Sequence, residues 1–406
     1  MDNEEIIQDK KDFQIKAKST SKSWIVFLSL GSLFLVAAIA LFVLTIAKPK
    51  EELADLDFPI LPTPKTTEAK IYDTITGREI SDIAENNSPV FCMQTPNGLD
   101  GARPQAGLNE AKVVFEAIAE AGITRFAAIY QNPQSAIIGP IRSLRLYYLQ
   151  WDTPFDCTIT HAGGAYDAIE AVRYGHYKDL TESYQYMYRG TIGARRWNNL
   201  FTTSHYLKQF ADDNGFSTSN PTGFTRLTPE QAENNRIDTQ AINKLRLLES
   251  TTSSTMSTLP RVTNITIKFG NINTYNPTFT YNADTNTYDR SYVSGGAHEV
   301  YNCPEGDLGE KNPEAVCELK QLSPSVVIAM TVQEKRASDN YHEDITTTGS
   351  GTVRIYQNGT SISGTWQKNS VGEQIKFFDE AGNEVALVPG QTWIAAVPQY
   401  GSVEEY

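Results

Sequence analysis

The chain has 406 residues, of which 40% are hydrophobic and 20% charged, and a formal net charge of −13. This composition is that of a globular protein, long enough for two domains and for a core built without metals or dense disulfides. The acidic balance argues against nucleic acid, or an anionic lipid surface, as the main partner of the whole molecule, because its summed field repels polyanions.

The first predicted element is a transmembrane helix. Residues 24–47 (WIVFLSLGSLFLVAAIALFVLTIA) contain no charged residue, and at ~1.5 Å per residue they cross a ~30 Å hydrocarbon layer with some tilt. More lysines precede this run than follow it, which predicts a cytoplasmic N-terminus and an extracytoplasmic body. A cleaved signal peptide is the alternative, but the run is longer than the usual signal core.

Changes in composition and in hydrophobic pattern divide the remaining chain into segments. Residues 1–23 are expected to form a cytoplasmic tail and residues 48–70, which mix Pro, Lys and Glu, a stalk. Residues 71–236 alternate strand-like runs (SPVFCMQ, CTITHAGG) with helical patterns (AYDAIEAVRYG, TSHYLKQFADDNG), which predicts an N-terminal domain of α/β type. Residues 237–260 are a connector. Residues 261–406 contain short alternating runs with Asn-Gly and Ala-Gly-Asn turn signals, which predicts mostly antiparallel sheet. The predicted fold class is therefore α+β.

Four cysteines suit an oxidising exterior. Cys303 and Cys317 bracket a polar segment with Gly and Pro, and a bridge there would close a short loop, adding ~3 kcal/mol of stability. Cys92 and Cys157 lie in strand-like segments, where two buried thiols are nearly as expected as a bridge. No Cys/His spacing typical of zinc is present, so neither a metal nor a cofactor is predicted.

Residues 102–131 (ARPQAGLNEAKVVFEAIAEAGITRFAAIYQ) are the richest in candidate functional residues, and a helix and a β-hairpin compete for them. The hairpin is favoured, with one helical turn at residues 108–112 before it, because ITRFAAIYQ is strand-like and Ala121-Gly122 supplies a two-residue turn.

This hairpin predicts a group of charged side chains. Pairing Glu120 with Ile123 places Arg125 opposite Ile118, on the same face as Glu116 and Glu120. One interpretation is a structural charge cluster that fixes the register. The other is the wall of a polar pocket, in which two carboxylates orient an arginine or act as acid and base.

Residues 138–150 (IGPIRSLRLYYLQ) place two cations in an otherwise apolar run. Pro140 suits the turn before a helix, and a helix that begins near Ile141 carries Arg142 and Arg145 one turn apart on one face. Either these arginines serve a ligand, or both pair with the hairpin carboxylates to hold the sheet together.

The run THAGGAYDAIEAV follows a strand-like segment and opens a helix. Gly163 and Gly164 would let backbone N–H groups face an anion at the helix start, although a glycine pair there is more often simple turn chemistry. His161 is a candidate general acid or base, and His205 and His298 are lesser ones. The chain shows none of the common phosphate-loop, metalloprotease, dinucleotide or nucleophile-elbow signatures, which lowers the expectation of an enzyme.

These motifs resemble the YerB-like bacterial lipoproteins, an envelope family with a domain of unknown function. The family pattern appears here as Asn97, ARPQAG, EAIAEAGITRF, IGPIRSLR and HAGG, and in the C-terminal half as FTYNADTNTYDRSYVSGGAHEVY, SISGTWQKN and LVPGQTWIAAVP. Ala121 replaces a family glycine, and no cysteine stands near the end of the hydrophobic run, so a helix anchor takes the place of the lipid. The resemblance implies an envelope location and a two-domain body, and no reaction.

Three functions are compared. The leading hypothesis is a membrane-anchored extracytoplasmic protein that binds an anionic envelope component, such as a wall-peptide carboxylate or a polymer phosphate. The second is a cell-wall hydrolase or transferase using His161 with Glu116 or Glu120. The third is an envelope scaffold whose β-rich domain docks a protein along a sheet edge. The predicted ligand-binding residues are Arg103, Arg125, Arg142, Arg145, His161, Glu116, Glu120, Gly163 and Gly164.

Overall fold

The computed structural model describes residues 69–190, 198–236, 262–304 and 317–406, all within one compact unit. The tail, the predicted transmembrane helix and nearly all of the stalk lie outside these residues, as does the connector. In the part of the chain that is described, no helix has the length and apolar character needed to span a bilayer.

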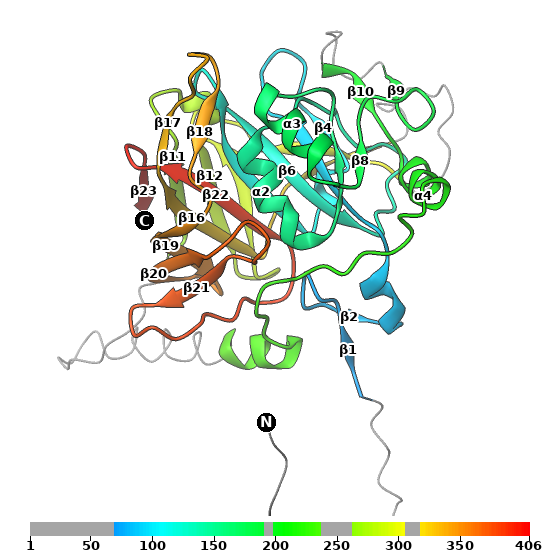
Figure 1. The fold of residues 1–406 in the computed structure, drawn as a ribbon. Coiled ribbons are helices and arrows are strands. Elements are labelled where there is room, and N and C mark those ends of the chain that lie inside the picture. The colour runs from blue at the N-terminus through cyan, green and yellow to red at the C-terminus, as the bar shows by residue number, and fades with distance from the viewer. Residues whose placement is uncertain (1–68, 191–197, 237–261, 305–316) are drawn as a thin grey trace, which may run out of the picture. The chain divides into compact units, whose positions relative to one another are not determined.

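A ten-stranded mixed sheet draws strands from both halves of the chain (Figure 1). The strand order is β21-β20-β19-β16-β22-β5-β6-β3-β7-β8. The bounds are β3 Val90–Pro96, β5 Val113–Glu120, β6 Ile123–Gln131, β7 Thr158–Thr160, β8 Asp179–Leu180, β16 Val326–Val332, β19 Gly349–Gln357, β20 Thr360–Lys368, β21 Lys376–Asp379 and β22 Thr392–Pro398.

Strand β22 joins the two halves of this sheet. It runs parallel to β16 on one side and parallel to β5 on the other, with Trp393 paired to Val114. Strands β5, β6 and β22 are buried along almost their whole length, as expected for strands covered on both faces. The hairpin strand β5 is therefore bonded directly to the C-terminal half of the chain.

Smaller sheets surround the large one. A four-stranded antiparallel sheet has the order β13-β12-β11-β23, and β15-β14-β4 form a three-stranded sheet. Three two-stranded pairs are β1-β2, β9-β10 and β17-β18. The bounds are β1 Ile71–Tyr72, β2 Glu79–Ile80, β4 Gln105–Ala106, β9 Tyr188–Arg189, β10 Leu200–Phe201, β11 Asn264–Lys268, β12 Pro277–Asn282, β13 Thr287–Tyr292, β14 Glu299–Asn302, β15 Glu318–Gln321, β17 Glu334–Arg336, β18 Glu343–Ile345 and β23 Ser402–Glu405.

The described helices are short. Three α-helices are α2 Leu146–Asp152, α3 Tyr166–Tyr174 and α4 Ser204–Asp213, and residues 229–236 are also helical. Single 3₁₀ turns are η1 Ile83–Asn87, η2 Leu108–Glu110, η3 Thr153–Phe155 and η5 Asn273–Tyr275. Helices α2 and α3 pack on one face of the large sheet, whereas α4 and the four-stranded sheet pack on the other.

The described fold is mostly β with few helices, and the sheets of the C-terminal part are largely antiparallel, as predicted. The hairpin, the strands at SPVFCMQ and CTITHAGG, and both helical patterns that end in glycine are confirmed. One predicted helix is wrong at its start: α2 begins at Leu146 and not near Ile141.

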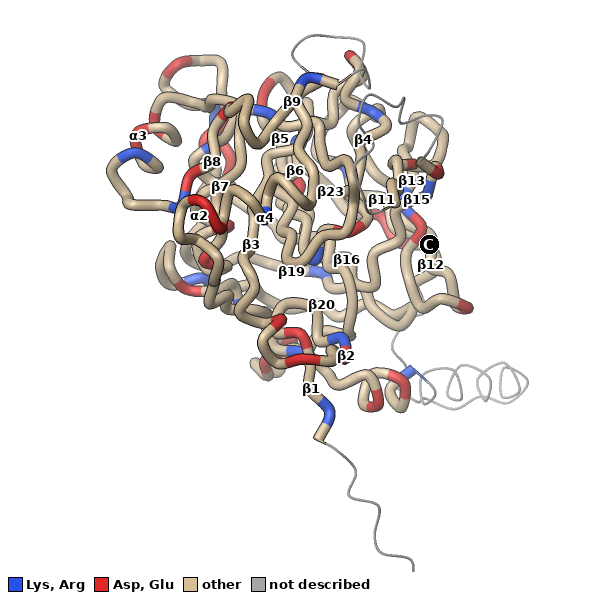
Figure 2. Tube along the Cα trace, turned by 90° about the vertical axis from the view of Figure 1, so that its right-hand side faces the viewer, with Lys and Arg blue, Asp and Glu red and all other residues tan. Residues whose placement is uncertain are grey.

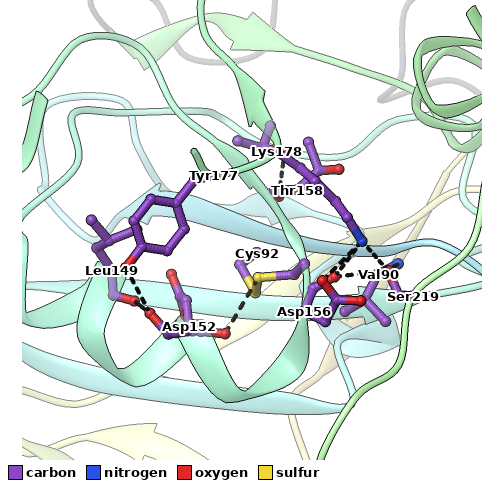
Figure 3. The surroundings of a disulfide bond; sticks show 12 residues. Val90, Cys92, Leu149, Asp152, Asp156, Thr158, Tyr177, Lys178 and Ser219 are labelled. Carbon is purple, nitrogen blue, oxygen red and sulfur yellow. Dashed lines mark hydrogen bonds and ion pairs between the residues drawn. A yellow bond between two sulfur atoms is a disulfide. The ribbon is translucent and has the colours of Figure 1, made fainter. Parts of the chain in front are cut away.

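Both pairs of cysteines form disulfides, Cys92–Cys157 and Cys303–Cys317. Figure 3 shows the first bond, which ties β3 to the residue before β7 beside the end of α2. Close to it, the ammonium group of Lys178 forms an ion pair with Asp156 (3.0 Å) and donates to the carbonyl of Thr218 (3.1 Å). A cavity of about 310 Å³ adjoins Cys157 and Lys178. The ammonium group of Lys178 in its wall also donates to the carbonyl of Asp156 and to the hydroxyl of Ser219.

Candidate functional site

A cavity of about 330 Å³ opens where the hairpin end, the loop after β3 and a residue of the C-terminal half meet. We name it the Arg142 cavity. Basic and acidic positions are interspersed along the chain trace (Figure 2). Its lining residues are Pro96, Asn97, Gly98, Leu99, Asp100, Glu120, Ile123, Thr124, Arg125, Arg142, Asn198 and Tyr275.

A β-bulge in the hairpin decides which side chains reach this cavity. Glu120 pairs with Ile123, as predicted, but the register then shifts, and Arg125 lies opposite Ala117. The prediction that Arg125 lies opposite Ile118 is therefore wrong. The extra residue on β5 turns the following side chain to the other face of the sheet. Glu116 and Glu120 consequently serve different faces instead of sharing one.

Glu120 is held between two arginines. Its two carboxylate oxygens accept hydrogen bonds from Arg125 (2.7 Å) and Arg145 (2.6 Å). Burial raises the pKa of Glu120, but the charges of Arg125, Arg145 and Arg142 together outweigh burial and hold that pKa below its ordinary value. The carboxylate is therefore ionised at neutral pH and acts as a structural anion between cations.

The segment before α2 is extended, which separates its two arginines. The backbone N–H groups of Ile141, Arg142 and Leu144 donate to Leu200, Gln94 and Gly163 instead of forming a helical turn. Arg145, the residue before α2, has extended backbone angles (φ −124°, ψ 149°). Because an extended chain does not bring residues three apart onto one face, Arg142 and Arg145 have different surroundings.

Arg142 is half-buried and lines the cavity. Within the described residues its guanidinium forms no hydrogen bond and no ion pair, and its Nε is buried without a partner. The interpretation in which both arginines pair with hairpin carboxylates thus holds for Arg145 alone. Because Arg125 and Arg145 share Glu120, no carboxylate of the described residues is bonded to Arg142, although the carboxylate of Asp100 also lines the cavity.

Glu116 faces the opposite side and is fully buried in a closed network. Its carboxylate accepts two 3.0 Å hydrogen bonds from Arg290, one from Trp393 (2.9 Å) and one from Thr124 (3.0 Å). Arg290 lies on β13 and Trp393 on β22, so the network ties the hairpin to two strands of the C-terminal half. Both carboxylate oxygens of Glu116 therefore accept hydrogen bonds from other residues of the fold.

Arg103 and His298 belong to the same buried region. Arg103 donates to Asn97 (2.8 Å), and its guanidinium carbon lies 3.8 Å from the ring centre of Tyr292. Burial, followed by the charges of Arg290 and Arg103, holds the pKa of His298 well below its ordinary value. The neutral ring accepts from Arg290 and donates to Gln105 (2.9 Å). Neither residue lines the cavity. Arg103 contacts its wall at Asn97, and His298 bonds to Gln105, whose side-chain amide donates to the carbonyl of Pro96.

His161, Gly163 and Gly164 lie in the loop after β7, which is hydrogen-bonded to the extended residues 141–145. His161 is 2% exposed, and its ring nitrogens lie 2.7 Å from the carbonyl oxygen of Gly163 and 2.9 Å from Asp179. The Gly163 carbonyl also accepts from Leu144. None of the three lines the Arg142 cavity. His161 contacts neither hairpin glutamate, so the geometry gives the predicted acid–base pair no support. His205 is exposed on α4.

Sequence reasoning missed Arg290, Trp393 and Asn198. Arg290 and Glu116 are 174 residues apart, and no local pattern links them. Arg290 lies between two tyrosines in the motif YDRSY, and this pattern of a cation between aromatic residues could have marked it as a candidate. Among the described residues no group of His, Cys, Asp and Glu is arranged to hold a metal ion.

Comparison with known proteins identifies both halves. Residues 75–217 match the family described as "Protein of unknown function (DUF3048) N-terminal domain", and residues 265–394 match the corresponding C-terminal domain. The "Putative lipoprotein YerB" of Bacillus subtilis is 24% identical over 341 residues, which cover 82% of this chain and 88% of that protein.

The fold agrees with that relative as well. The crystal structure of YerB protein from Bacillus subtilis matches with a TM-score of 0.63 and 20% identity, covering 82% of this chain and 100% of that one. The sequence match and both domain matches lead to one conclusion: the chain is homologous to YerB and belongs to the family that carries the two DUF3048 domains.

Proposed function

We propose that this protein is an envelope protein, anchored to the membrane at its N-terminus, whose extracytoplasmic body binds an anionic cell-envelope component in the Arg142 cavity. The name of the relative, a lipoprotein, supports a membrane-attached location. The uncharged run at residues 24–47 supports a single-pass helix as the means of attachment. The two disulfides fit an oxidising exterior.

The observation that carries the binding proposal is the unpartnered guanidinium of Arg142 in the cavity wall. A half-buried cation that is bonded to no carboxylate of the described residues favours an anion, and a planar guanidinium binds carboxylate or phosphate through two parallel hydrogen bonds. Arg125 and Arg145 do not compete for the ligand, because Glu120 already neutralises them in part. Arg125 and Arg145 raise the local positive potential while they remain bonded to Glu120.

The size of the cavity limits the ligand. A volume of about 330 Å³ lies at the lower end of the range for small-molecule pockets, ~300–1,000 Å³. It accommodates one residue or one terminal group rather than a long stretch of polymer. The proposed ligand is therefore an anionic end group presented by an envelope component.

The test is retention of the full-length protein on purified cell wall, with Arg142→Ala as the variant. We expect retention to fall by ~10–100-fold, because a hydrogen bond to a charged group contributes ~1.5–3 kcal/mol. Arg173→Ala is the matched control, since Arg173 is an exposed arginine in the last turn of α3. Equal retention of wild type and a folded Arg142→Ala protein would contradict the proposal.

A further inference from the structure

The Arg142 cavity contains an unpartnered acceptor as well as an unpartnered donor. Asn198 lines it and is 2% exposed. Its amide nitrogen donates to the backbone carbonyl (3.2 Å) and to the carboxylate (2.8 Å) of Asp100, and these two acceptors fix which end of the amide is nitrogen. The other end, Oδ1, is buried and has no partner among the described residues.

These two groups require a ligand with complementary ends. Arg142 needs an anionic acceptor, whereas Asn198 Oδ1 needs an N–H or O–H donor. Buried polar groups in folded proteins are nearly always paired, so an orphaned donor and an orphaned acceptor in one cavity indicate two contacts that a ligand completes. A bare anion satisfies only the first of them.

Part of the remaining wall is apolar, beside the polar side chains of Asn97, Asp100, Glu120, Thr124 and Arg125. Leu99 is 66% exposed at the cavity, and Ile123, Pro96 and Tyr275 line it too. A small hydrocarbon side chain suits these neighbours. A polyol phosphate has no hydrocarbon side chain to pack on this apolar part of the wall.

We infer that the cavity takes the C-terminal residue of a peptide. The terminal carboxylate binds Arg142, the amide N–H of the same residue donates to Asn198 Oδ1, and a small apolar side chain packs against Leu99 and Tyr275. The inference rests on the proposed function, because it names the chemical class of the anion that the same cavity binds. It adds Asn198 as the residue that distinguishes a peptide end from other anions.

The experiment is a chemical-shift titration of the full-length protein with four small probes: N-acetylalanine, propionate, N-acetylalaninamide and glycerol phosphate. We expect N-acetylalanine to bind at least ~10-fold more tightly than propionate, which lacks the N–H, and than the amide, which lacks the charge. In Asn198→Ala the advantage over propionate should fall below ~3-fold while propionate affinity is unchanged. Asn199→Ala is the control, because Asn199 does not line the cavity.

The outcomes separate the two claims. Equal affinity for N-acetylalanine and propionate, or tighter binding of glycerol phosphate, overturns the peptide inference. In both cases the proposed function survives if Arg142→Ala still lowers retention on cell wall. If retention does not depend on Arg142, the proposed function fails together with the inference. The probe series on the wild-type protein decides the ligand class even if Asn198→Ala does not fold.

Discussion

Glu116 and Glu120 lie on the same strand, four residues apart, yet they belong to opposite kinds of site. Glu116 is fully buried, and Arg290, Trp393 and Thr124 satisfy its carboxylate from several sides. Glu120 borders a cavity and is shared by Arg125 and Arg145, beside Arg142, which has no bonded partner among the described residues. The first is a closed network that holds the two halves of the chain together. The second is open toward the cavity, and we propose that a ligand completes it.

This comparison teaches that the charged residues of the motif segments differ in whether the fold pairs them, and that their number alone does not indicate a binding site. Three of the four candidate arginines, His161 and both glutamates have partners within the fold. Arg142 alone among these candidates makes no bond within the described residues, and the proposed binding function therefore centres on it.

The largest expected effect comes from opening the closed network with Arg290→Met. We expect the free energy of unfolding to fall by ~3–5 kcal/mol, because removal of one partner leaves the buried Glu116 carboxylate uncompensated. Urea denaturation measures it. The double variant Glu116→Gln with Arg290→Met should recover part of the loss, and a double variant no more stable than the single one would show that the charge was not the cause.

A smaller loss is expected from Glu120→Gln. The substitution removes the anion shared by Arg125 and Arg145, and we expect a loss of ~2 kcal/mol at neutral pH. The folded-state pKa of Glu120 is lowered, so its contribution is fully present above the ordinary glutamate pKa and is lost as pH falls through the lower folded value.

The stability difference between wild type and Glu120→Gln should therefore be constant near neutral pH and shrink in acid. Denaturation series at several pH values measure this difference. A difference that grows as the pH falls would contradict the assignment of Glu120 as the shared counter-ion.

Arg142→Ala should leave stability nearly unchanged, within ~0.5 kcal/mol, or raise it slightly, because no bond within the described residues is lost and a half-buried unpaired charge is removed. Thermal unfolding measures this. A loss as large as that of Glu120→Gln would mean that Arg142 has a structural partner, and the contrast between open and closed sites would not hold.

The smallest effect concerns the hairpin turn. Ala121 and Gly122 both have left-handed backbone angles (φ 50° and 76°), which alanine adopts at a cost. We expect Ala121→Gly to stabilise the protein by up to ~1 kcal/mol while wall retention stays the same. A destabilised variant would indicate that the Ala121 side chain makes a favourable contact that outweighs the backbone strain.

The sequence predicted local features well, and non-local ones poorly. The hairpin at residues 113–131 and helices α3 and α4 follow from alternation, helical spacing and glycine ends. The β-bulge did not follow, because it depends on which neighbours each strand meets. The Arg142 segment was predicted as a helix from Pro140, but its backbone groups bond to Gln94, Leu200 and Gly163, which are distant in sequence.

In the candidate site, too, local features could be predicted from the sequence and non-local ones could not. Arg142 was among the predicted residues because its motif placed cations in an apolar run. That Arg145 is paired and Arg142 is not depends on the bulge that brings Glu120 to their side. Asn198 and Tyr275 join the cavity from remote parts of the chain, and nothing in their local sequence marks them.

The most direct test of the central claim is to follow the Nε–H signals of the arginine side chains by NMR while purified wall fragments are added. If the cavity binds an anionic end group, the Arg142 signal shifts with the titration. The signals of Arg145 and Arg290 stay in place, because neither residue lines the cavity and the Nη2 groups of both are bonded to Glu120 and Glu116. An Arg142 signal that does not move while the fragments bind elsewhere would contradict the account.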